Sequence, residues 1–167
     1  MKFLPVIIII MLFTACKKKE NTFVIDSNYR SEIDSFFKTK MAERKGNYLQ
    51  LVALHKLNLG NNTFGKENNN DLVLKIEKLP INVGNIFMKG DSLSFIANEN
   101  PVVKTKEDSI ITKIPLELNQ YGNSIKLFHE QLNWQIITRS KQPYLRVWDT
   151  KNPAIEAFKG FKKFDLN

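Results

Sequence analysis

Few residues in this chain of 167 are of the types that carry out covalent chemistry. The sequence contains one cysteine, Cys16, and two histidines, His55 and His129, which both stand in strand-like contexts. A catalytic zinc ion normally has three protein ligands at recognisable spacing, and no such set is present. The Gly-x-Ser-x-Gly turn of many hydrolases and the glycine-rich phosphate loop are also missing. We therefore expect no metal ion and no cofactor, and a structural or surface role for both histidines.

Carboxylates are the other candidate catalysts. A fold could bring Glu117, Glu130 and Asp149 together as in a glycosidase, where two acids flank the bond that is cleaved. Nothing in their spacing places them side by side, and scattered surface carboxylates are the simpler interpretation. The sequence therefore favours a protein without catalytic activity, with a hydrolase as the alternative.

A second group of residues is suited to binding a ligand. In an extended strand, Tyr144, Arg146 and Trp148 share one face, because successive side chains alternate between the two faces. An arginine between aromatic rings can stack on them and still reach an acid such as Asp149. With Arg139 shortly before it, this segment could form one corner of a ligand groove. A structural ion pair on the face of a sheet is the commoner outcome for such residues.

The N-terminus carries the most specific pattern in the sequence. Lys2 is followed by an apolar run over residues 3–13 and then by Thr14, Ala15 and Cys16. This order is typical of a secretory signal, and the run is too short to span a membrane. Small residues directly before a cysteine resemble a bacterial lipoprotein signal, with an ordinary secretory signal as the alternative. The resemblance implies cleavage before Cys16 and acyl chains on that residue, which would hold the protein stably on a membrane.

The residues after Cys16 are basic, and so is the whole chain, with a formal net charge of +8. Lys17, Lys18 and Lys19 predict either a solvated tether or a contact with anionic headgroups. No aspartate follows the cysteine, which favours the outer membrane if the cell is Gram-negative. We predict a location in the cell envelope, attached to membrane lipid through Cys16. The expected partner is an envelope protein or polymer, and no nucleic acid is expected.

One amphipathic helix is predicted ahead of the candidate binding residues. Asp26 or Ser27 can cap its start, and Gly46 is expected to end it. Its apolar residues recur at helical spacing and predict a face that docks on the following domain. These residues are Tyr29, Ile33, Phe36, Phe37 and Met41.

From Tyr48 onward, short apolar or alternating runs are separated by Gly, Asn, Asp and Pro. This pattern predicts a mainly β fold, an antiparallel β-sandwich. The sandwich and the helix before it are expected to form one domain over residues 26–167. A signal peptide over residues 1–15 and a tether over residues 16–25 are expected to precede this domain. The candidate strands are 49–57, 62–65, 71–76, 83–88, 92–97, 102–104, 110–118, 124–128, 132–139 and 144–148. A last strand is expected over 158–164, packing its aromatic residues on the core.

Two segments resemble a known family. Residues 57–74 and residues 136–161 are similar, in order and spacing, to the N-terminal part of an uncharacterised bacterial family, domain of unknown function 1684. Members of that family continue well beyond the matching part, and their most distinctive motif lies in that second half. This chain ends at Asn167 without that motif, so the resemblance implies no activity that depends on it.

The first segment also resembles the start of a forkhead-associated domain, a β-sandwich that binds phosphothreonine. Gly65-Lys66 and Asp71-Leu72-Val73-Leu74 carry this likeness, which would place the Lys66 cation near a phosphate. Lys66 stands where that family has an arginine, and lysine cannot make the two-pronged contact of a guanidinium. The downstream Ser-Arg-x-x-His motif of the family is missing between Leu79 and Phe87. The resemblance therefore implies the fold rather than phosphopeptide binding.

We expect an envelope lipoprotein that binds or scaffolds a partner at the membrane surface, with a hydrolase of envelope polymers as the alternative. A half-domain that needs a partner to complete its sheet is a third reading. The candidate ligand-binding residues are Lys66, Arg139, Arg146, Trp148 and Asp149.

Overall fold

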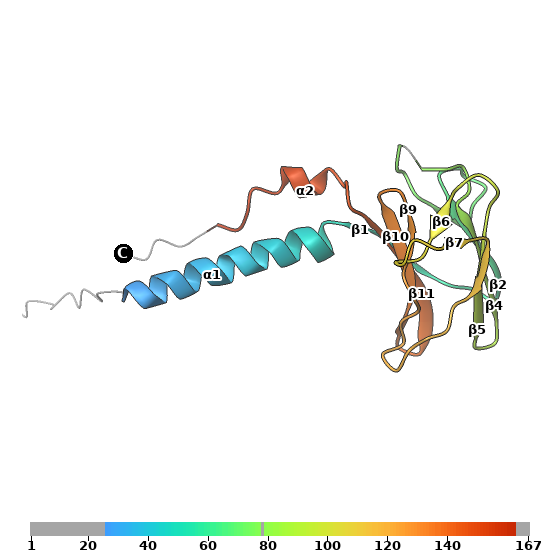
Figure 1. Cartoon of the computed structure of the whole chain (residues 1–167), viewed down its shortest axis with the longest axis horizontal. Helices are drawn as coiled ribbons and strands as arrows, with labels where there is room; N and C mark the ends of the chain where they lie inside the picture. The colour runs from blue at the N-terminus through green and yellow to red at the C-terminus, as the bar shows by residue number, and fades with distance from the viewer. Residues whose placement is uncertain (1–25, 78, 163–167) are drawn as a thin grey trace, which may run out of the picture.

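The computed structural model describes residues 26–77 and 79–162 and contains two β-sheets preceded by a helix (Figure 1). The six-stranded sheet has the order β1 (Leu51–Lys56), β11 (Gln142–Asp149), β10 (Leu132–Arg139), β9 (Leu127–His129), β6 (Val103–Lys104) and β7 (Ile110–Ile111). The five-stranded sheet has the order β3 (Leu72–Val73), β2 (Gly60–Gly65), β4 (Gly84–Lys89), β5 (Ser92–Ala97) and β8 (Lys113–Pro115). Neighbouring strands are antiparallel except β2 and β3, which pair in parallel. The predicted mainly β sandwich after one helix is confirmed.

Most strands lie where the alternation of apolar and polar residues predicts them. β5 and β10 have the predicted bounds. The predicted strand over 110–118 is two strands in different sheets, because Ile111 pairs with β6 while Ile114 pairs with β5. The chain therefore crosses from one sheet to the other near Thr112.

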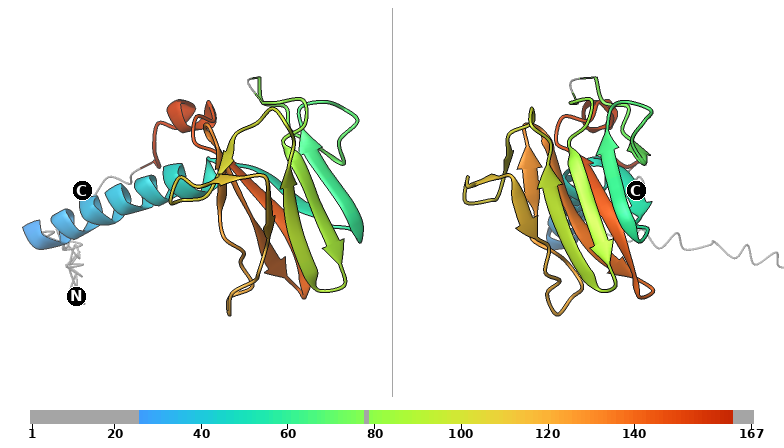
Figure 2. Two further views of the ribbon diagram at one scale, coloured as in Figure 1. Left: turned by 45° about the vertical axis from the view of Figure 1, so that its right-hand side comes forward. Right: turned by 90° about the vertical axis from the view of Figure 1, so that its right-hand side faces the viewer.

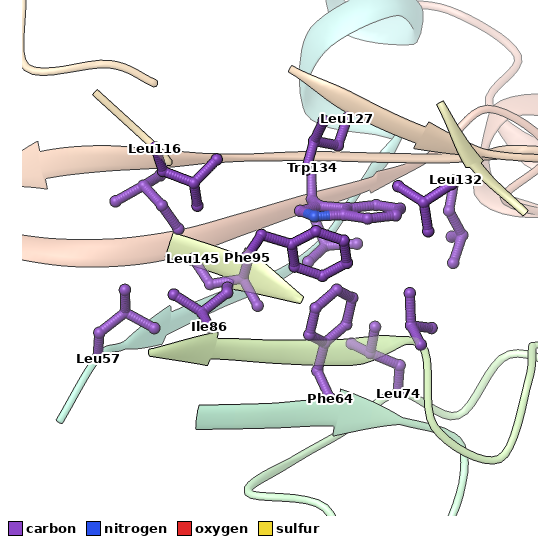
Figure 3. Packing of buried hydrophobic residues seen from close by; sticks show 14 of the residues in the cluster. Leu57, Phe64, Leu74, Ile86, Phe95, Leu116, Leu127, Leu132, Trp134 and Leu145 are labelled. Carbon is purple, nitrogen blue, oxygen red and sulfur yellow. The ribbon is translucent and has the colours of Figure 1, made fainter. Parts of the chain in front are cut away.

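Aromatic rings from both sheets meet in the middle of the core (Figure 3). Phe64 on β2 and Phe95 on β5 contact Trp134 on β10, with ring centroids 5.3 Å and 5.6 Å from the indole. Both contacts are edge-on, and such pairs add roughly 0.5–1.5 kcal/mol beyond the burial of their area. All three side chains are at most 1% exposed. This cluster fastens the two sheets together.

The helix α1 (Ser27–Glu43) starts where predicted, because the Asp26 carboxylate accepts a hydrogen bond from the Asn28 backbone N–H at 3.1 Å. The prediction that Gly46 ends the helix is wrong. A π-helical turn over Arg44–Tyr48 (η1) carries the helix through Gly46. A glycine that ends a helix usually has a positive φ, and the φ of Gly46 is not positive.

The predicted docking of α1 on the sandwich is also wrong. None of its residues is buried, and the helix projects away from the sheets (Figures 1 and 2). Its half-buried side chains, Ile33, Phe37 and Met41, form one stripe. A Cβ built on Gly160 would come within 3.3 Å of the Met41 methyl carbon, so the C-terminal segment lies against this stripe.

The C-terminal segment forms no strand within the described residues, which corrects the prediction for its first part. It contains the short helix α2 (Ala154–Ala157), after which the Phe158 and Phe161 rings meet at 5.3 Å. A further strand has no place beside β11, because β1 and β10 already pair with its two edges. Phe164 lies outside the described residues.

Candidate functional site

The structure brings together only two of the five predicted ligand-binding residues. Arg146 and Trp148 lie on the same face of β11, and Asp149 ends that strand. Arg139 is exposed at the turn between β10 and β11, and Lys66 follows β2 in the other sheet. The predicted set is therefore not one site.

Lys66 is engaged by its own loop. Its ammonium donates a hydrogen bond to the Glu77 carbonyl oxygen at 3.0 Å, and its backbone N–H donates to the Pro80 carbonyl oxygen at 3.0 Å. Gly65 lies so close to the backbone of the segment that contains Ile81 that a Cβ at Gly65 would overlap the Ile81 carbonyl oxygen. Close backbone packing explains why residue 65 is a glycine, and the hydrogen bonds of Lys66 fix the loop that follows it.

Asp71, in the same segment, also has a structural role. Its carboxylate accepts hydrogen bonds from the Thr63 backbone N–H at 2.7 Å and the Thr63 hydroxyl at 2.9 Å. The backbone bond and then the hydroxyl bond hold the pKa of Asp71 below its ordinary value of 3.8. These bonds tie the start of β3 to β2.

The outer face of the six-stranded sheet holds a group of cations around one indole. The Arg146 guanidinium carbon lies 4.6 Å from the centroid of the Trp148 ring, so the predicted stacking is present. The Lys126 ammonium nitrogen lies 4.5 Å from the same centroid. We call Lys126, Arg146 and Trp148 the Trp148 cluster.

Asp149 does not complete this cluster as an ion pair. Its carboxylate accepts a hydrogen bond from the Lys151 backbone N–H at 2.8 Å, which turns the chain after β11. Within residues 26–77 and 79–162, neither Lys126 nor Arg146 forms an ion pair with a carboxylate. The sequence favoured a structural ion pair for the segment that contains Arg146 and Asp149. The structure does not show that ion pair among the described residues.

Sequence reasoning missed Lys126, although the register of the sheet explains its position. Leu127 pairs with Trp134, and the next residue of β10, Gln135, pairs with Arg146. Lys126 thus comes beside Gln135 on the outer face. Burial, and then the nearby Arg146, lower the pKa of Lys126 from its ordinary value of 10.5. The strand pairing that brings Lys126 here is not visible in one sequence.

The outward positions of β1, β11 and β10 carry no acidic side chain. Directly paired residues of an antiparallel sheet share a face, so the register identifies these positions. They are Leu54 and Lys56 on β1, Tyr144, Arg146 and Trp148 on β11, and Asn133, Gln135 and Ile137 on β10. This face is basic, aromatic and amide-rich.

Two of the three predicted acids line one surface hollow. Glu130 and Asp149 lie with Glu77, Lys75 and other residues around a space of about 530 Å³. Glu117 is not among the residues that line it.

The histidines do not join these acids in a metal site. The Nδ1 atom of His129 lies 3.1 Å from the Val102 carbonyl oxygen, and the Nε2 atom of His55 is buried without a hydrogen-bond partner in the described part of the chain. No group of three or more potential metal ligands is found among the described residues.

The signal peptide, Cys16 and the tether lie outside the described residues, so their predictions stay predictions. Within the described ranges, no helix has the length and apolar character needed to cross a membrane.

Comparison with known proteins gives structural likenesses and no family match. No family model and no curated protein matches the chain, so the resemblance to domain of unknown function 1684 gains no support. The chain is similar to a crystal structure of the FhaA FHA domain complexed with the intracellular domain of Rv3910. The TM-score is 0.36 at 12% identity, covering 55% of this chain and 85% of that chain.

Proposed function

We propose that this protein is a membrane-anchored envelope lipoprotein whose β-sandwich is a non-catalytic binding or scaffolding module. The observation that carries this proposal is the position of α1, which projects from the sandwich without burying a residue (Figure 1). Its 17 residues span about 25 Å. The helix acts as a spacer between the sandwich and the end of the chain that carries Cys16.

The outer face of the six-stranded sheet is the binding surface in this proposal. The six-stranded sheet lies between α1 and the five-stranded sheet, so its outer face is turned toward the side on which the helix projects (Figure 1). That face carries Lys56, Arg146 and the Trp148 indole without an acid at an outward position of β1, β10 or β11. Such a surface favours a negatively charged partner.

Lipid attachment is tested by growing cells with a fatty acid that carries a chemical tag. The wild-type protein is expected to incorporate the tag and to sediment with membranes. Cys16→Ala removes the only cysteine and is expected to abolish the tag and release the protein. Retention of the variant in membranes at the wild-type level would refute anchoring through Cys16.

The binding role is tested by crosslinking in cells, comparing wild type with Arg146→Ala and Lys66→Ala. A defined crosslinked partner is expected in wild type, and Arg146→Ala is expected to lose it. Lys66→Ala is the matched control, because it removes a charge whose ammonium bonds to the Glu77 carbonyl of its own loop. A partner that survives Arg146→Ala and disappears with Lys66→Ala would place the binding surface elsewhere.

A hydrolase of envelope polymers is the second candidate, supported by the shared hollow of Glu130 and Asp149. Purified peptidoglycan incubated with the protein would then release new reducing ends. Glu130→Gln and Asp149→Asn would each abolish that release, while Glu117→Gln would not. Absence of turnover by the wild-type protein rejects this candidate.

A further inference from the structure

The Trp148 cluster places two like charges at one ring. Both cations contact one indole, at 4.5 Å for Lys126 and 4.6 Å for Arg146. Burial, and then the charge of Arg146, lower the pKa of Lys126 from its ordinary value, as expected for like charges at one ring. An anion bound by both cations would offset the repulsion between them.

Two side-chain amides of β10 share the outer face with the cations. Asn133 pairs with Trp148 and Gln135 pairs with Arg146, so both amides share the outer face with the cluster. Asn133 is only 8% exposed, yet its side chain has no hydrogen-bond partner among the described residues. The Gln135 side chain is likewise without one in the described ranges. Each amide offers N–H donors beside the two charged groups.

We propose that Lys126, Arg146, Asn133 and Gln135 form a binding site for a phosphate-type oxyanion on the outer face of the six-stranded sheet, beside Trp148. A guanidinium presents parallel N–H donors that match two phosphate oxygens, and an ammonium binds phosphate as a point charge. The amides supply donors for the remaining oxygens. The site rests on the proposed binding role and gives it a ligand chemistry.

Two carboxylates of the six-stranded sheet, Asp149 and Asp108, are bonded to other groups. Asp149 is buried at the end of β11, where its carboxylate bonds to the Lys151 backbone. Asp108, on the far side of the same sheet, is paired with Lys104 at 2.8 Å. The donors of the cluster therefore have no protein acceptor among the described residues, as a ligand site requires.

Binding is measured by titrating the full chain with inorganic phosphate and following tryptophan fluorescence. Trp148 lies in the proposed site, whereas Trp134, at 1% exposed, lies in the core and supplies a constant background. Wild type is expected to give a saturable change. Lys126→Met and Arg146→Met are each expected to weaken binding at least tenfold. Circular dichroism checks that each variant is folded.

Lys113→Met is the matched control. It removes the same charge from an exposed position of β8, in the five-stranded sheet. It is expected to leave phosphate binding unchanged. A loss equal to that of Lys126→Met would mean that net charge alone attracts the anion, and would overturn the site.

A second arm identifies the source of the phosphate group. Vesicles of phosphatidylglycerol are compared with vesicles of phosphatidylcholine, using Cys16→Ala so that no acyl anchor contributes. Binding of inorganic phosphate indicates a soluble ligand. A preference for phosphatidylglycerol vesicles that disappears with Lys126→Met, without binding of free phosphate, indicates a lipid headgroup. No Lys126-dependent binding in either arm overturns the proposal.

Failure of this site and failure of the proposed function give different results. If crosslinking finds a partner that depends on Arg146 while neither phosphate probe binds, the binding role stands and the oxyanion site is rejected. If a phosphate probe binds but no partner is found, the site stands and the scaffolding role is rejected.

Discussion

At the scale of single residues, the asparagine-rich segment before β3 illustrates how buried polar groups hold this fold. Asn62 is 2% exposed, and its amide donates to the carbonyl oxygens of Asn58 at 2.8 Å and Ile86 at 3.1 Å. Its side-chain oxygen accepts from the Asn58 backbone N–H at 2.7 Å. This side chain fastens the loop before β2 to β4, which gives Asn62 a structural role.

Asn62→Ala is expected to lower the free energy of unfolding by about 2–3 kcal/mol, because it leaves buried backbone groups without partners. Urea unfolding measures the effect. The control is Asn68→Ala, an exposed asparagine in the following loop, which should change stability by less than about 0.5 kcal/mol. Equal effects of the two substitutions would contradict the structural role of Asn62.

Asp71→Asn tests the hydrogen bonds to Thr63 through their pH dependence. The pKa of Asp71 is lowered in the folded protein, so its carboxylate stabilises the fold above the ordinary value of 3.8. That contribution is lost as the pH falls through the lowered value. At pH 7 the variant should lose about 1 kcal/mol, a modest figure because the group is exposed to solvent. The difference from wild type should shrink as the pH falls below the ordinary value of 3.8. The control is Asp91→Asn, in the exposed β4–β5 turn, which should change stability at pH 7 by less than about 0.5 kcal/mol.

Lys126→Met separates binding from stability. A lysine whose pKa is lowered by folding costs stability at neutral pH, and that cost disappears as the pH rises toward the ordinary 10.5. Methionine keeps apolar contact with the indole and removes the repulsion by Arg146. The variant should therefore stay within about 0.5 kcal/mol of wild type at pH 7 in thermal or urea unfolding. A loss of more than about 2 kcal/mol would assign Lys126 a structural role instead.

At the scale of elements, patterns within one segment were predictable and contacts between segments were not. The alternation along β10 and β11 places Trp134, Leu145 and Val147 inside, and all three are at most 1% exposed. Lys126 reaches Arg146 only through the pairing of β9, β10 and β11, which no local pattern encodes. The stripe of α1 was recognisable, but its neighbour is the C-terminal segment near Gly160.

Glycine substitutions test two of these element assignments. Gly65→Ala is expected to cost about 2–3 kcal/mol, because the added methyl group overlaps the backbone of Ile81. Gly46→Ala should instead stabilise by about 0.5–1 kcal/mol, since Gly46 lies in a helical turn with open space around it. Thermal unfolding of both variants provides the measurement. A destabilising Gly46→Ala would mean that the helix ends at this glycine, as its sequence alone suggests.

At the scale of the whole molecule, the protein consists of a projecting helix, proposed as a spacer, and a β-sandwich whose two outer faces differ in their side chains. The Phe64, Phe95 and Trp134 rings lock the sheets together, so the two faces hold fixed positions. The face of the six-stranded sheet carries the Trp148 cluster, while the face of the five-stranded sheet includes the exposed Phe87. The account therefore assigns binding to one face only.

Site-specific photo-crosslinking in cells tests this assignment most directly. A photoreactive side chain is placed either at Ile137, on the outer face of the six-stranded sheet, or at Phe87, on the outer face of the five-stranded sheet. The account predicts a defined adduct from position 137 that disappears when Arg146→Ala is added, and none from position 87. Adducts from position 87 alone, or adducts from position 137 that persist with Arg146→Ala, would contradict it.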